Sequence, residues 1–320
     1  MQNVIVLGST GSLGIQMLRV LKKHKNKFKV VAITAKTSQK LLFKQGDELG
    51  LSSRGILLNN QSATRSLISS QNIDIVINLI SGVDGIASTR ETIKAKKILI
   101  LGNKESAVAG TLTKNANVIP VDSEHNAIFE ILKKFPEEKI KTITLPASGG
   151  QFHKAKSLKG ITPEQAIKHP KWKMGPKISV ESATLLNKGL EIIEAHYLFN
   201  VPLKDIKVVV HPECEIHGMV EFKNGETYGY FDLPNMEKHL ENGLLHAIGE
   251  KIKIDIRQLL PSNLKFQKPN PLLLQGINLV LAAFKKDPKK MLTFLKKEEK
   301  AINDFLKGKI EFKDIYKTLK

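Results

Sequence analysis

The 320-residue sequence has one cysteine, few aromatic side chains and no long apolar run. Because Cys214 is alone, an intrachain disulfide is excluded, and this composition is typical of a protein in a reducing cytoplasm. No stretch approaches the ~18 consecutive apolar residues of a membrane-spanning helix. The first residues, MQNVIVLGSTGSLG, contain no basic region or cleavage site, so we expect no signal peptide. A cytoplasmic protein without a membrane partner is therefore predicted.

Basic residues are in large excess, with 50 Lys and Arg against 31 Asp and Glu. A net charge of +19 raises the possibility of nucleic-acid binding. The lysine-rich segments at 22–29, 285–290 and 296–300, however, lie on separate helical patterns. An aromatic content of 6% leaves no series of rings on which bases could stack. We interpret the lysines as solvated helix faces that would also attract phosphorylated molecules, and we expect no nucleic-acid partner.

Short apolar runs alternate with helical patterns over the first 120 residues. The runs lie at 4–8, 29–35, 73–81, 96–102 and 118–121. Fully apolar runs bounded by glycine or polar residues are typical of buried parallel strands connected by helices. This part of the chain is therefore predicted to be a Rossmann-like domain.

The pattern changes beyond residue 140. A strand at 142–150 ends in a glycine turn, and one helical pattern runs through SATLLNKGLEIIEAHYLF. Segments 208–222 and 227–233 alternate as antiparallel strands do, and helical patterns follow from about residue 240. We expect an α/β protein with a Rossmann-like domain at 1–122, an α/β domain with a mixed sheet at 123–250, and a small helical domain at 251–320.

The segment GSTGSLG directly follows the first predicted strand and opens a helix. In such loops Gly8 allows a tight turn, Gly11 lets the backbone approach a pyrophosphate, and Gly14 permits close packing of the helix. The spacing GxxGxxG departs from GxGxxG by placing Thr10 at the middle position. The position after strand one favours a dinucleotide site. The alternative is a glycine turn that serves packing alone.

The end of the second predicted strand indicates which dinucleotide is used. A site for NAD usually has an acidic residue there to bind the ribose hydroxyl groups. This sequence instead has Lys36, Thr37 and Ser38. A cation beside two hydroxyl groups suits a 2′-phosphate, which favours NADPH. A solvated polar turn is the alternative.

Two carboxylates, Asp122 and Glu124, stand where a strand passes into a helix. Because carboxylates this close repel one another unless they are protonated or bound to a metal, the pair indicates a cation site. Oxygen ligands favour Mg²⁺ or Mn²⁺. The alternative is helix capping by Asp122 or Ser123, with acidic residues favoured in the first helical turn.

Three further stretches carry candidate ligands. Asn187 and Glu191 share a helix face if the helix continues through Gly189, where a close approach by another group is plausible. Ser148 lies beside two glycines, which is typical of a phosphate-binding turn. Lys104 follows another predicted strand, where α/β sheets bind their ligands. A capped helix, a turn and a surface helix start are the respective alternatives.

Taken together, these segments resemble 1-deoxy-D-xylulose 5-phosphate reductoisomerases. The resemblance runs through GSTGSLG, NKES at 103–106, PVDSEHNAIF at 120–129, SGG at 148–150, HPKWKMGPKISVESATLLNKGLEIIEA at 169–195 and HPECEIHGMVEF at 211–222. It implies an NADPH- and divalent-metal-dependent oxidoreductase of non-mevalonate isoprenoid biosynthesis. Such an enzyme rearranges and reduces 1-deoxy-D-xylulose 5-phosphate to 2-C-methyl-D-erythritol 4-phosphate. A homodimer is also implied, with the middle domain as the catalytic domain.

The resemblance assigns expected roles to individual residues. The metal ligands would be Asp122, Glu124 and Glu191, with Lys104 as a further catalytic residue. The substrate would contact Ser123, Ser148, His169, Trp172, Ser182, Asn187 and Lys188. The cofactor would contact Gly8, Ser9, Thr10, Gly11, Ser12, Leu13, Lys36, Thr37, Ser38, Asn103, Glu105, Met174 and Gly175. A flexible lid would lie near 168–178.

Four departures from the family pattern bear on lid movement, dimer contact and rate. The family usually has a small polar residue at Lys173, a basic one at Pro176 and proline at Gln151, and Asn235 stands in a loop that usually reads close to PDMR. The C-terminus is also shorter than usual. A dehydrogenase acting on another sugar phosphate and a non-catalytic nucleic-acid-binding protein are the competing hypotheses.

Overall fold

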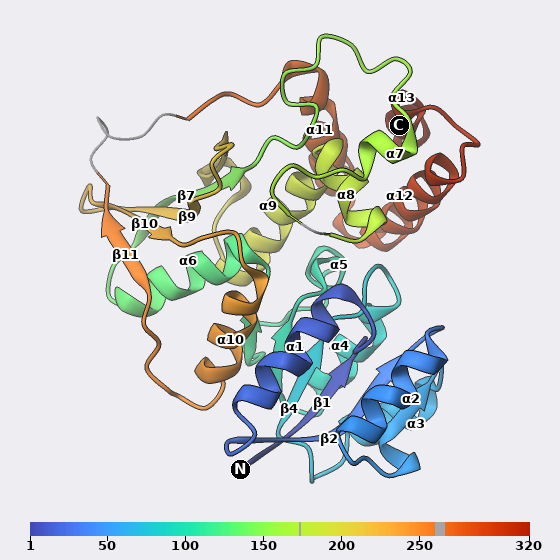
Figure 1. The fold of residues 1–320 in the computed structure, drawn as a ribbon. Coiled ribbons are helices and arrows are strands. Elements are labelled where there is room, and N and C mark those ends of the chain that lie inside the picture. The colour runs from blue at the N-terminus through green and yellow to red at the C-terminus, as the bar shows by residue number, and fades with distance from the viewer. Residues whose placement is uncertain (173, 260–265) are drawn as a thin grey trace. The chain divides into compact units, whose positions relative to one another are not determined.

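The computed structural model describes residues 1–172, 174–259 and 266–320. These residues form two compact units, each built around one sheet (Figure 1). The first unit contains Met1–Ser106, Thr111–Asp122 and Asn235–Lys253, and the second contains Ala107–Gly110, Ser123–Pro234 and Ile254–Lys320. The division into three domains at 122 and 250 stays a prediction. Lys173, one of the four departures, lies outside the described residues.

The sheet of the first unit is parallel, with the strand order β3-β2-β1-β4-β5-β6. Its strands are β1 (Gln2–Leu7), β2 (Phe28–Ala35), β3 (Ile56–Leu58), β4 (Ile75–Asn78), β5 (Ile98–Leu101) and β6 (Val118–Pro120). This is the order of a dinucleotide-binding fold, so the predicted Rossmann-like architecture is confirmed. Strand β3 was not predicted.

The helices of the first unit come from the N-terminal part of the chain and from one later segment, Asn235–Lys253. They are α1 (Ser12–Lys23), α2 (Gln39–Glu48), α3 (Gln61–Ile68), α4 (Gly85–Lys94), α5 (Lys104–Val108), which ends in the second unit, and α10 (Met236–His246). Leu240 and Leu244 of α10 belong to the same buried cluster as Val4 and Met17. Apolar burial therefore anchors this returning helix to the first unit.

The second unit contains a mixed sheet with the order β11-β10-β9-β7-β8. Its strands are β7 (Ile140–Ala147), β8 (Ile206–Val210), β9 (Ile216–Phe222), β10 (Thr227–Phe231) and β11 (Asp255–Gln258). Strands β7 and β8 pair in parallel and the other pairs are antiparallel. The mixed sheet is confirmed, but the expectation of an antiparallel β8 is wrong, because helix α9 carries the chain back before β8 begins. Strand β11 lies in a segment that was expected to be helical.

Helices of the second unit cover this sheet and continue toward the C-terminus. They are α6 (Ser123–Lys134), α7 (Pro163–Ala166), α8 (Pro176–Ala183), α9 (Leu186–Phe199), α11 (Pro271–Lys286), α12 (Met291–Leu306) and α13 (Phe312–Leu319). Figure 1 shows α6 lying along β9 and β10, and α9 packs on β7 and β8. Short 3-10 turns lie at Ser53–Gly55, Leu203–Asp205 and Pro288–Lys290.

The helix expected at 182–199 is interrupted between α8 and α9. Leu185 adopts a left-handed conformation with φ of 55°. Thr184, the C-cap of α8, donates its hydroxyl to the Val180 and Glu181 carbonyls. The prediction of one continuous helix is therefore wrong at this point, although α9 does run through Gly189 as expected.

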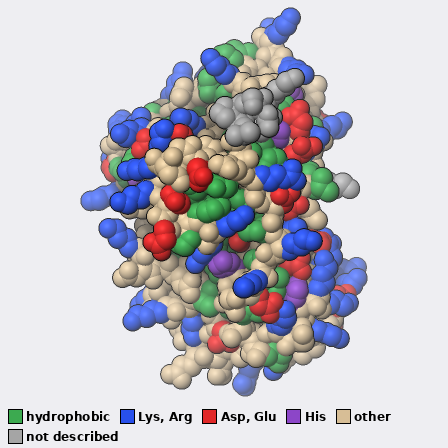
Figure 2. Space-filling model, turned by 90° about the vertical axis from the view of Figure 1, so that its left-hand side faces the viewer, with side chains coloured by type: hydrophobic (Ala, Val, Ile, Leu, Met, Phe, Trp, Pro, Cys, Tyr) green, Lys and Arg blue, Asp and Glu red, His purple; other side chains and the backbone are tan. Residues whose placement is uncertain are grey.

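Within the described ranges, no helix combines the length and apolarity needed to cross a membrane. On the face shown in Figure 2, Lys and Arg side chains are distributed among acidic and apolar ones. This distribution agrees with solvated lysines on separate elements, as the sequence indicated.

Candidate active site

The glycine loop connects β1 to α1 at the edge of the parallel sheet. Gly8 has φ of 78°, and a Cβ atom there would lie 2.9 Å from the Leu79 carbonyl oxygen that follows β4. A Cβ atom on Gly14 would lie 2.2 Å from the Gly8 oxygen. These two glycines therefore serve the tight turn and the close packing that the sequence predicted. Helix α1 begins at Ser12, and the first amides of a helix attract anions.

Two residues expected to contact the cofactor are used inside the protein. Ser9 is fully buried, and its hydroxyl lies 2.8 Å from Gln45 Oε1 on α2. Asn103 is also fully buried, and its amide donates to the carbonyls of Ile80 and Gly82. Both side chains therefore shape the surrounding loops, and their direct contact with a cofactor stays a prediction.

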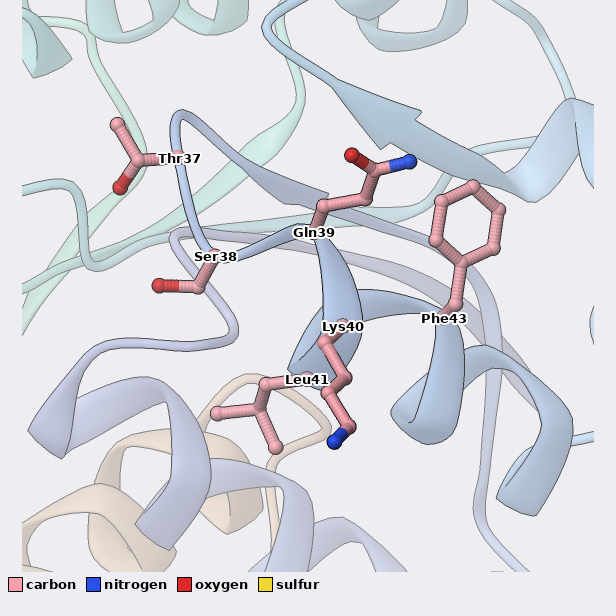
Figure 3. Close-up of a pocket in the computed structure, with 6 residues that line it drawn as sticks. All are labelled: Thr37, Ser38, Gln39, Lys40, Leu41 and Phe43. Atoms are coloured by element: carbon pink, nitrogen blue, oxygen red, sulfur yellow. The ribbon is translucent and has the colours of Figure 1, made fainter.

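A pocket lies at the end of β2, where the sequence indicated a 2′-phosphate. It is lined by Thr37, Ser38, Gln39, Lys40, Leu41 and Phe43 (Figure 3). In this view the hydroxyl groups of Thr37 and Ser38 project to the same side of the loop, away from Phe43. The Lys36 ammonium lies 2.6 Å from the Asp84 carboxylate, a partner that sequence reasoning missed. Since the Lys36 side chain is 68% exposed, this pair is weak and Lys36 remains accessible to an anion.

Three carboxylates meet at the start of α6. Asp122 directly precedes the helix, Glu124 lies in its first turn, and Glu191 lies on α9. One oxygen from each residue lies within 4.8 Å of the others. Asp122 is joined to Ser123 by a peptide bond, so the chain itself fixes it beside Glu124. The structure thus brings the three predicted metal ligands together.

Two lysines neutralise most of this negative charge. Lys104 Nζ lies 2.7 Å from Asp122 Oδ2, and Lys188 Nζ lies 2.5 Å from Glu124 Oε1 and also contacts Glu191. Burial alone would lower the pKa of Lys188, but the carboxylates of Glu124 and Glu191 outweigh this effect and hold it above its ordinary value. Two ammonium groups against three carboxylates leave the cluster with a net charge of about −1.

The cluster has the chemistry of a site for a hard divalent cation. It offers only carboxylate oxygens, which Mg²⁺ and Mn²⁺ prefer. Glu191 is buried to 1% exposure, whereas the Asp122 and Glu124 side chains are 18% and 16% exposed. The Asp122 and Glu124 carboxylates are therefore the more accessible part of the cluster. The donor set therefore fits the expected metal.

The capping alternative receives only partial support. Helix α6 begins at Ser123, which places Asp122 at its N-cap position. The Ser123 hydroxyl, however, donates to the Glu124 carboxylate, and Asp122 is paired with Lys104. Both side chains are therefore engaged within the carboxylate cluster.

A second group of possible ligands shares Asp122 with the first. It consists of Asp122, His125 and Glu194. His125 is fully buried, with Nδ1 3.4 Å from Glu194 and Nε2 donating to the Glu191 carbonyl at 3.0 Å. Sequence reasoning missed His125 and Glu194 as site residues, although both lie in the quoted motifs. Through its bond to the Glu191 backbone, His125 supports the first group.

The glycine turn after β7 lies against the end of α8. Gly149 and Gly150 have φ of 82° and 64°, and the Gly150 amide donates to the Ser148 hydroxyl at 3.1 Å. A Cβ atom on Gly150 would lie 3.4 Å from the Ser182 carbonyl oxygen. The turn that carries Ser148 therefore lies against the backbone of Ser182. Asn187 donates to Glu191, and Lys188 faces the carboxylates, so their phosphate contacts stay predictions.

His169 connects this turn to the segment expected to form a lid. Its Nδ1 accepts the amides of Lys171 and Trp172, so Nε2 carries the proton and donates to the Ser148 hydroxyl at 2.9 Å. Burial lowers the pKa of His169 to about 4, which keeps the ring neutral. The ring of Trp172 makes an edge contact with His217, with centroids 6.0 Å apart.

Two departures from the family pattern have structural explanations. Gln151 donates from its amide to the Gln165 and Ala166 carbonyls, which connects the glycine turn to α7. Pro176 is the first residue of α8, with Gly175 as its N-cap. Proline is favoured there because a first-turn amide has no partner within the helix.

Comparison with known proteins identifies the same family from both parts of the chain. The sequence model of 1-deoxy-D-xylulose 5-phosphate reductoisomerase matches residues 4–57 and 47–111, and that of the C-terminal domain matches residues 118–199. The reductoisomerase of Clostridium botulinum (strain 657 / Type Ba4) is 37% identical, with 98% of this chain and 90% of the relative covered. That of Thermodesulfovibrio yellowstonii is 35% identical, with coverages of 100% and 91%.

Solved structures of the same enzyme share the fold. A complex of DOX-P reductoisomerase with NADPH, fosmidomycin and magnesium has a TM-score of 0.86 at 29% identity, covering 100% of this chain and 88% of that one. The Zymomonas mobilis enzyme with NADPH has a TM-score of 0.83 at 28% identity, with coverages of 99% and 90%. The sequence matches extend over nearly the whole chain and include the carboxylate cluster. The chain therefore belongs to the 1-deoxy-D-xylulose 5-phosphate reductoisomerase family.

Proposed function

We propose that this protein converts 1-deoxy-D-xylulose 5-phosphate to 2-C-methyl-D-erythritol 4-phosphate with NADPH and a divalent cation, in isoprenoid biosynthesis. The observation that carries the proposal is the convergence of Asp122, Glu124 and Glu191 within 4.8 Å of one another. Family membership supplies the substrate and the reaction.

Asp122, Glu124 and Glu191 would hold Mg²⁺ or Mn²⁺. When bound, the cation supplies Lewis-acid polarisation of the substrate's carbonyl and neighbouring hydroxyl oxygens, and NADPH supplies the hydride. Lys104, held 2.7 Å from Asp122, would donate a hydrogen bond to a substrate oxygen. Ser123 lies between Asp122 and Glu124 in the chain and would contact the hydroxylated part of the substrate. Fixed charges that need no rearrangement lower the barrier most effectively.

The phosphate group of the substrate would lie at the glycine turn after β7. Gly150 of this turn lies against the backbone of Ser182, and Asn187 and Lys188 lie in the first turn of α9. Binding energy at this remote group orients the substrate without taking part in the bond changes. His169 and Trp172 would cover the site and keep water out.

The cofactor would bind along the glycine loop of the first unit. Its pyrophosphate would lie at the N-terminus of α1, next to Gly11, Ser12 and Leu13. Lys36, Thr37 and Ser38 would bind the 2′-phosphate, while Thr10, Glu105, Met174 and Gly175 would make further contacts. Preference for NADPH over NADH is thus expected to depend on the end of β2.

The direct test is NADPH oxidation by the purified chain with 1-deoxy-D-xylulose 5-phosphate and Mg²⁺ or Mn²⁺. We expect turnover that EDTA abolishes and that added metal restores. A folded protein that shows no turnover with this substrate, but oxidises NADPH with another sugar phosphate, would favour the competing dehydrogenase hypothesis.

A homodimer in the cytoplasm is the remaining part of the proposal. The resemblance supports the dimer, and the single cysteine supports a reducing compartment. Sedimentation equilibrium of the purified chain tests the oligomeric state, with a mass of twice 35.6 kDa expected. A monomer that retains full activity would contradict the dimer.

A further inference from the structure

Two residues near the C-terminus make polar contacts with the loop after the glycine turn and with the α8–α9 junction. They are Asn270, the N-cap of α11, and Tyr316 on α13. Neither residue belongs to the segments that the resemblance assigned to a site. Both nevertheless contact backbone groups that adjoin the proposed phosphate ligands.

Asn270 holds the loop that follows the glycine turn. Its amide nitrogen lies 2.9, 3.2 and 3.3 Å from the carbonyl oxygens of Ala155, His153 and Phe152, respectively. Its Oδ1 accepts the Leu272 amide at 2.9 Å, which caps α11. One side chain thus performs two separable tasks, because the oxygen caps the helix and the nitrogen holds the loop.

This loop is coupled to the glycine turn itself. His153 Nδ1 bonds to the Gly150 carbonyl at 2.8 Å, and a Cβ atom on Gly149 would lie 2.7 Å from His153 Cβ. Phe152 packs edge-on against Phe312 of α13, with ring centroids 5.4 Å apart. A shift of the loop would therefore move the turn that carries Ser148.

Tyr316 holds the second half of the proposed phosphate site, the junction between α8 and α9. Its hydroxyl donates to the Thr184 carbonyl at 3.1 Å, and the side chain is 1% exposed. Gly276 of α11 reaches the same carbonyl so closely that a Cβ atom would lie 2.0 Å from its oxygen. The left-handed Leu185 follows directly, and such a conformation persists only when its surroundings enforce it.

We propose that Asn270 and Tyr316 are positioning residues that fix the two halves of the phosphate site, the turn at Ser148 and the junction between Ser182 and Asn187. The inference rests on the proposed function for the identity of the bound phosphate. The anchoring itself follows from the contacts of Asn270 and Tyr316 and does not depend on which phosphate binds. The C-terminal helices thereby act on substrate affinity through residues that never touch the substrate.

Asn270→Asp separates the two tasks of Asn270. The carboxylate still caps α11 but cannot donate to the three carbonyls, which it repels. We expect KM for 1-deoxy-D-xylulose 5-phosphate to rise about tenfold, with kcat changed less than about threefold and KM for NADPH unchanged. Asn60→Asp is the matched control, because Asn60 caps α3 by accepting the Ala63 amide at 2.9 Å. It should leave every constant unchanged.

Tyr316→Phe removes one hydroxyl and keeps the ring, so it is the gentler variant. We expect KM for the sugar phosphate to rise about fivefold, with the same pattern in the other constants. Tyr228→Phe is its control, since it removes a single hydrogen bond to Glu226 at 3.2 Å elsewhere in the same unit.

Two measurements test the anchors without turnover. Amide hydrogen exchange should accelerate at 148–155 in Asn270→Asp and at 182–188 in Tyr316→Phe, and calorimetry should show weaker binding of inorganic phosphate. Variants with wild-type exchange, phosphate affinity and KM would overturn the inference. So would a parallel loss of NADPH affinity, which would indicate general destabilisation. Inactivity of the wild-type chain would instead refute the proposed function while the exchange data still decide the anchoring.

Discussion

The cofactor loop and the carboxylate cluster are built in different ways. The loop from Gly8 to Gly14 is contiguous, and it would bind the cofactor through backbone amides that become available when glycine allows the chain to turn. The cluster joins Asp122 and Glu124 to Glu191, nearly seventy residues later, and it acts through side chains. A contiguous loop depends on local conformation, whereas a cluster from distant segments depends on the packing of α6 against α9.

This difference determines what a substitution can damage. In the cluster, each carboxylate contributes charge that no neighbour can replace, and removal of one changes the electrostatic balance at once. In the loop, the functional atoms belong to the backbone, so a side chain matters through the space it fills. We therefore expect larger effects on catalysis in the cluster and graded effects on cofactor affinity in the loop.

Glu191→Gln should have the largest effect. The change keeps the shape of the side chain and removes one of three negative charges, so kcat/KM should fall on the order of 10³-fold and Mn²⁺ affinity about 100-fold. NADPH affinity should stay unchanged. Steady-state kinetics, calorimetry with Mn²⁺ and fluorescence titration with NADPH measure the three quantities.

Glu194→Gln is the matched control on the same helix. Glu194 is also buried, but it belongs to the group with His125, three residues further along α9. We expect Glu194→Gln to lower Mn²⁺ affinity about tenfold, as for a residue that supports a metal ligand. A larger loss of Mn²⁺ affinity in Glu194→Gln than in Glu191→Gln would assign the metal to the other group.

The same contrast explains how much could be predicted from the sequence. The parallel strands and the glycine loop were predictable because their signals are local, namely apolar runs and glycine spacing. The meeting of Glu124 with Glu191 follows from tertiary packing, and only the family resemblance indicated it. Asp84, which pairs with Lys36, carries no local signal at all.

The errors have physical causes of the same kind. Strand β11 has one apolar residue among its four, so it shows no apolar run, and the short strand β3 was missed as well. The break at Leu185 was missed because leucine rarely adopts a left-handed conformation, and here the contacts of Thr184 with α11 and α13 impose it. Long-range contacts of this type cannot be read from neighbouring residues.

Gly11→Ala should have the next largest effect, a loss of NADPH affinity at the loop from Gly8 to Gly14. A Cβ atom at Gly11 would lie 3.3 Å from the Gly8 oxygen, a contact that a small shift can relieve. The free energy of unfolding should change by less than about 1 kcal/mol, while the Kd of NADPH should rise about 30-fold because the pyrophosphate can no longer approach the backbone. Thermal melts and fluorescence titration measure these changes.

Gly14→Ala provides the contrast within the same loop. Its Cβ atom would lie 2.2 Å from the Gly8 oxygen and 2.6 Å from the Ser9 backbone, so the loop itself must move. Stability should fall by about 1–3 kcal/mol together with NADPH affinity. Unchanged NADPH affinity in Gly11→Ala would show that the pyrophosphate does not approach this residue.

Lys36→Ala should have a smaller effect, confined to one phosphate group. Removal of an exposed cation should raise KM for NADPH about tenfold and leave KM for NADH unchanged. Lys44→Ala, an exposed cation of α2 outside the lining of this pocket, serves as the control and should change KM for NADPH less than about twofold. Equal effects on the two cofactors would mean that Lys36 does not bind the 2′-phosphate.

The smallest effect is a pH dependence of the free energy of unfolding, and it comes from the His169 side chain. Burial lowers the pKa of His169 to about 4, so the unfolded chain binds more protons than the folded one between about pH 4 and 6.5. The stabilisation is therefore present above about pH 6.5 and is lost as the pH falls toward 4. For a partly exposed ring this stabilisation should amount to about 1 kcal/mol.

His169→Gln should flatten this pH dependence in denaturant melts recorded from pH 4 to 7, and NMR titration of the wild-type ring measures its pKa directly. A ring that titrates near pH 6.5 would show that His169 is not buried in solution.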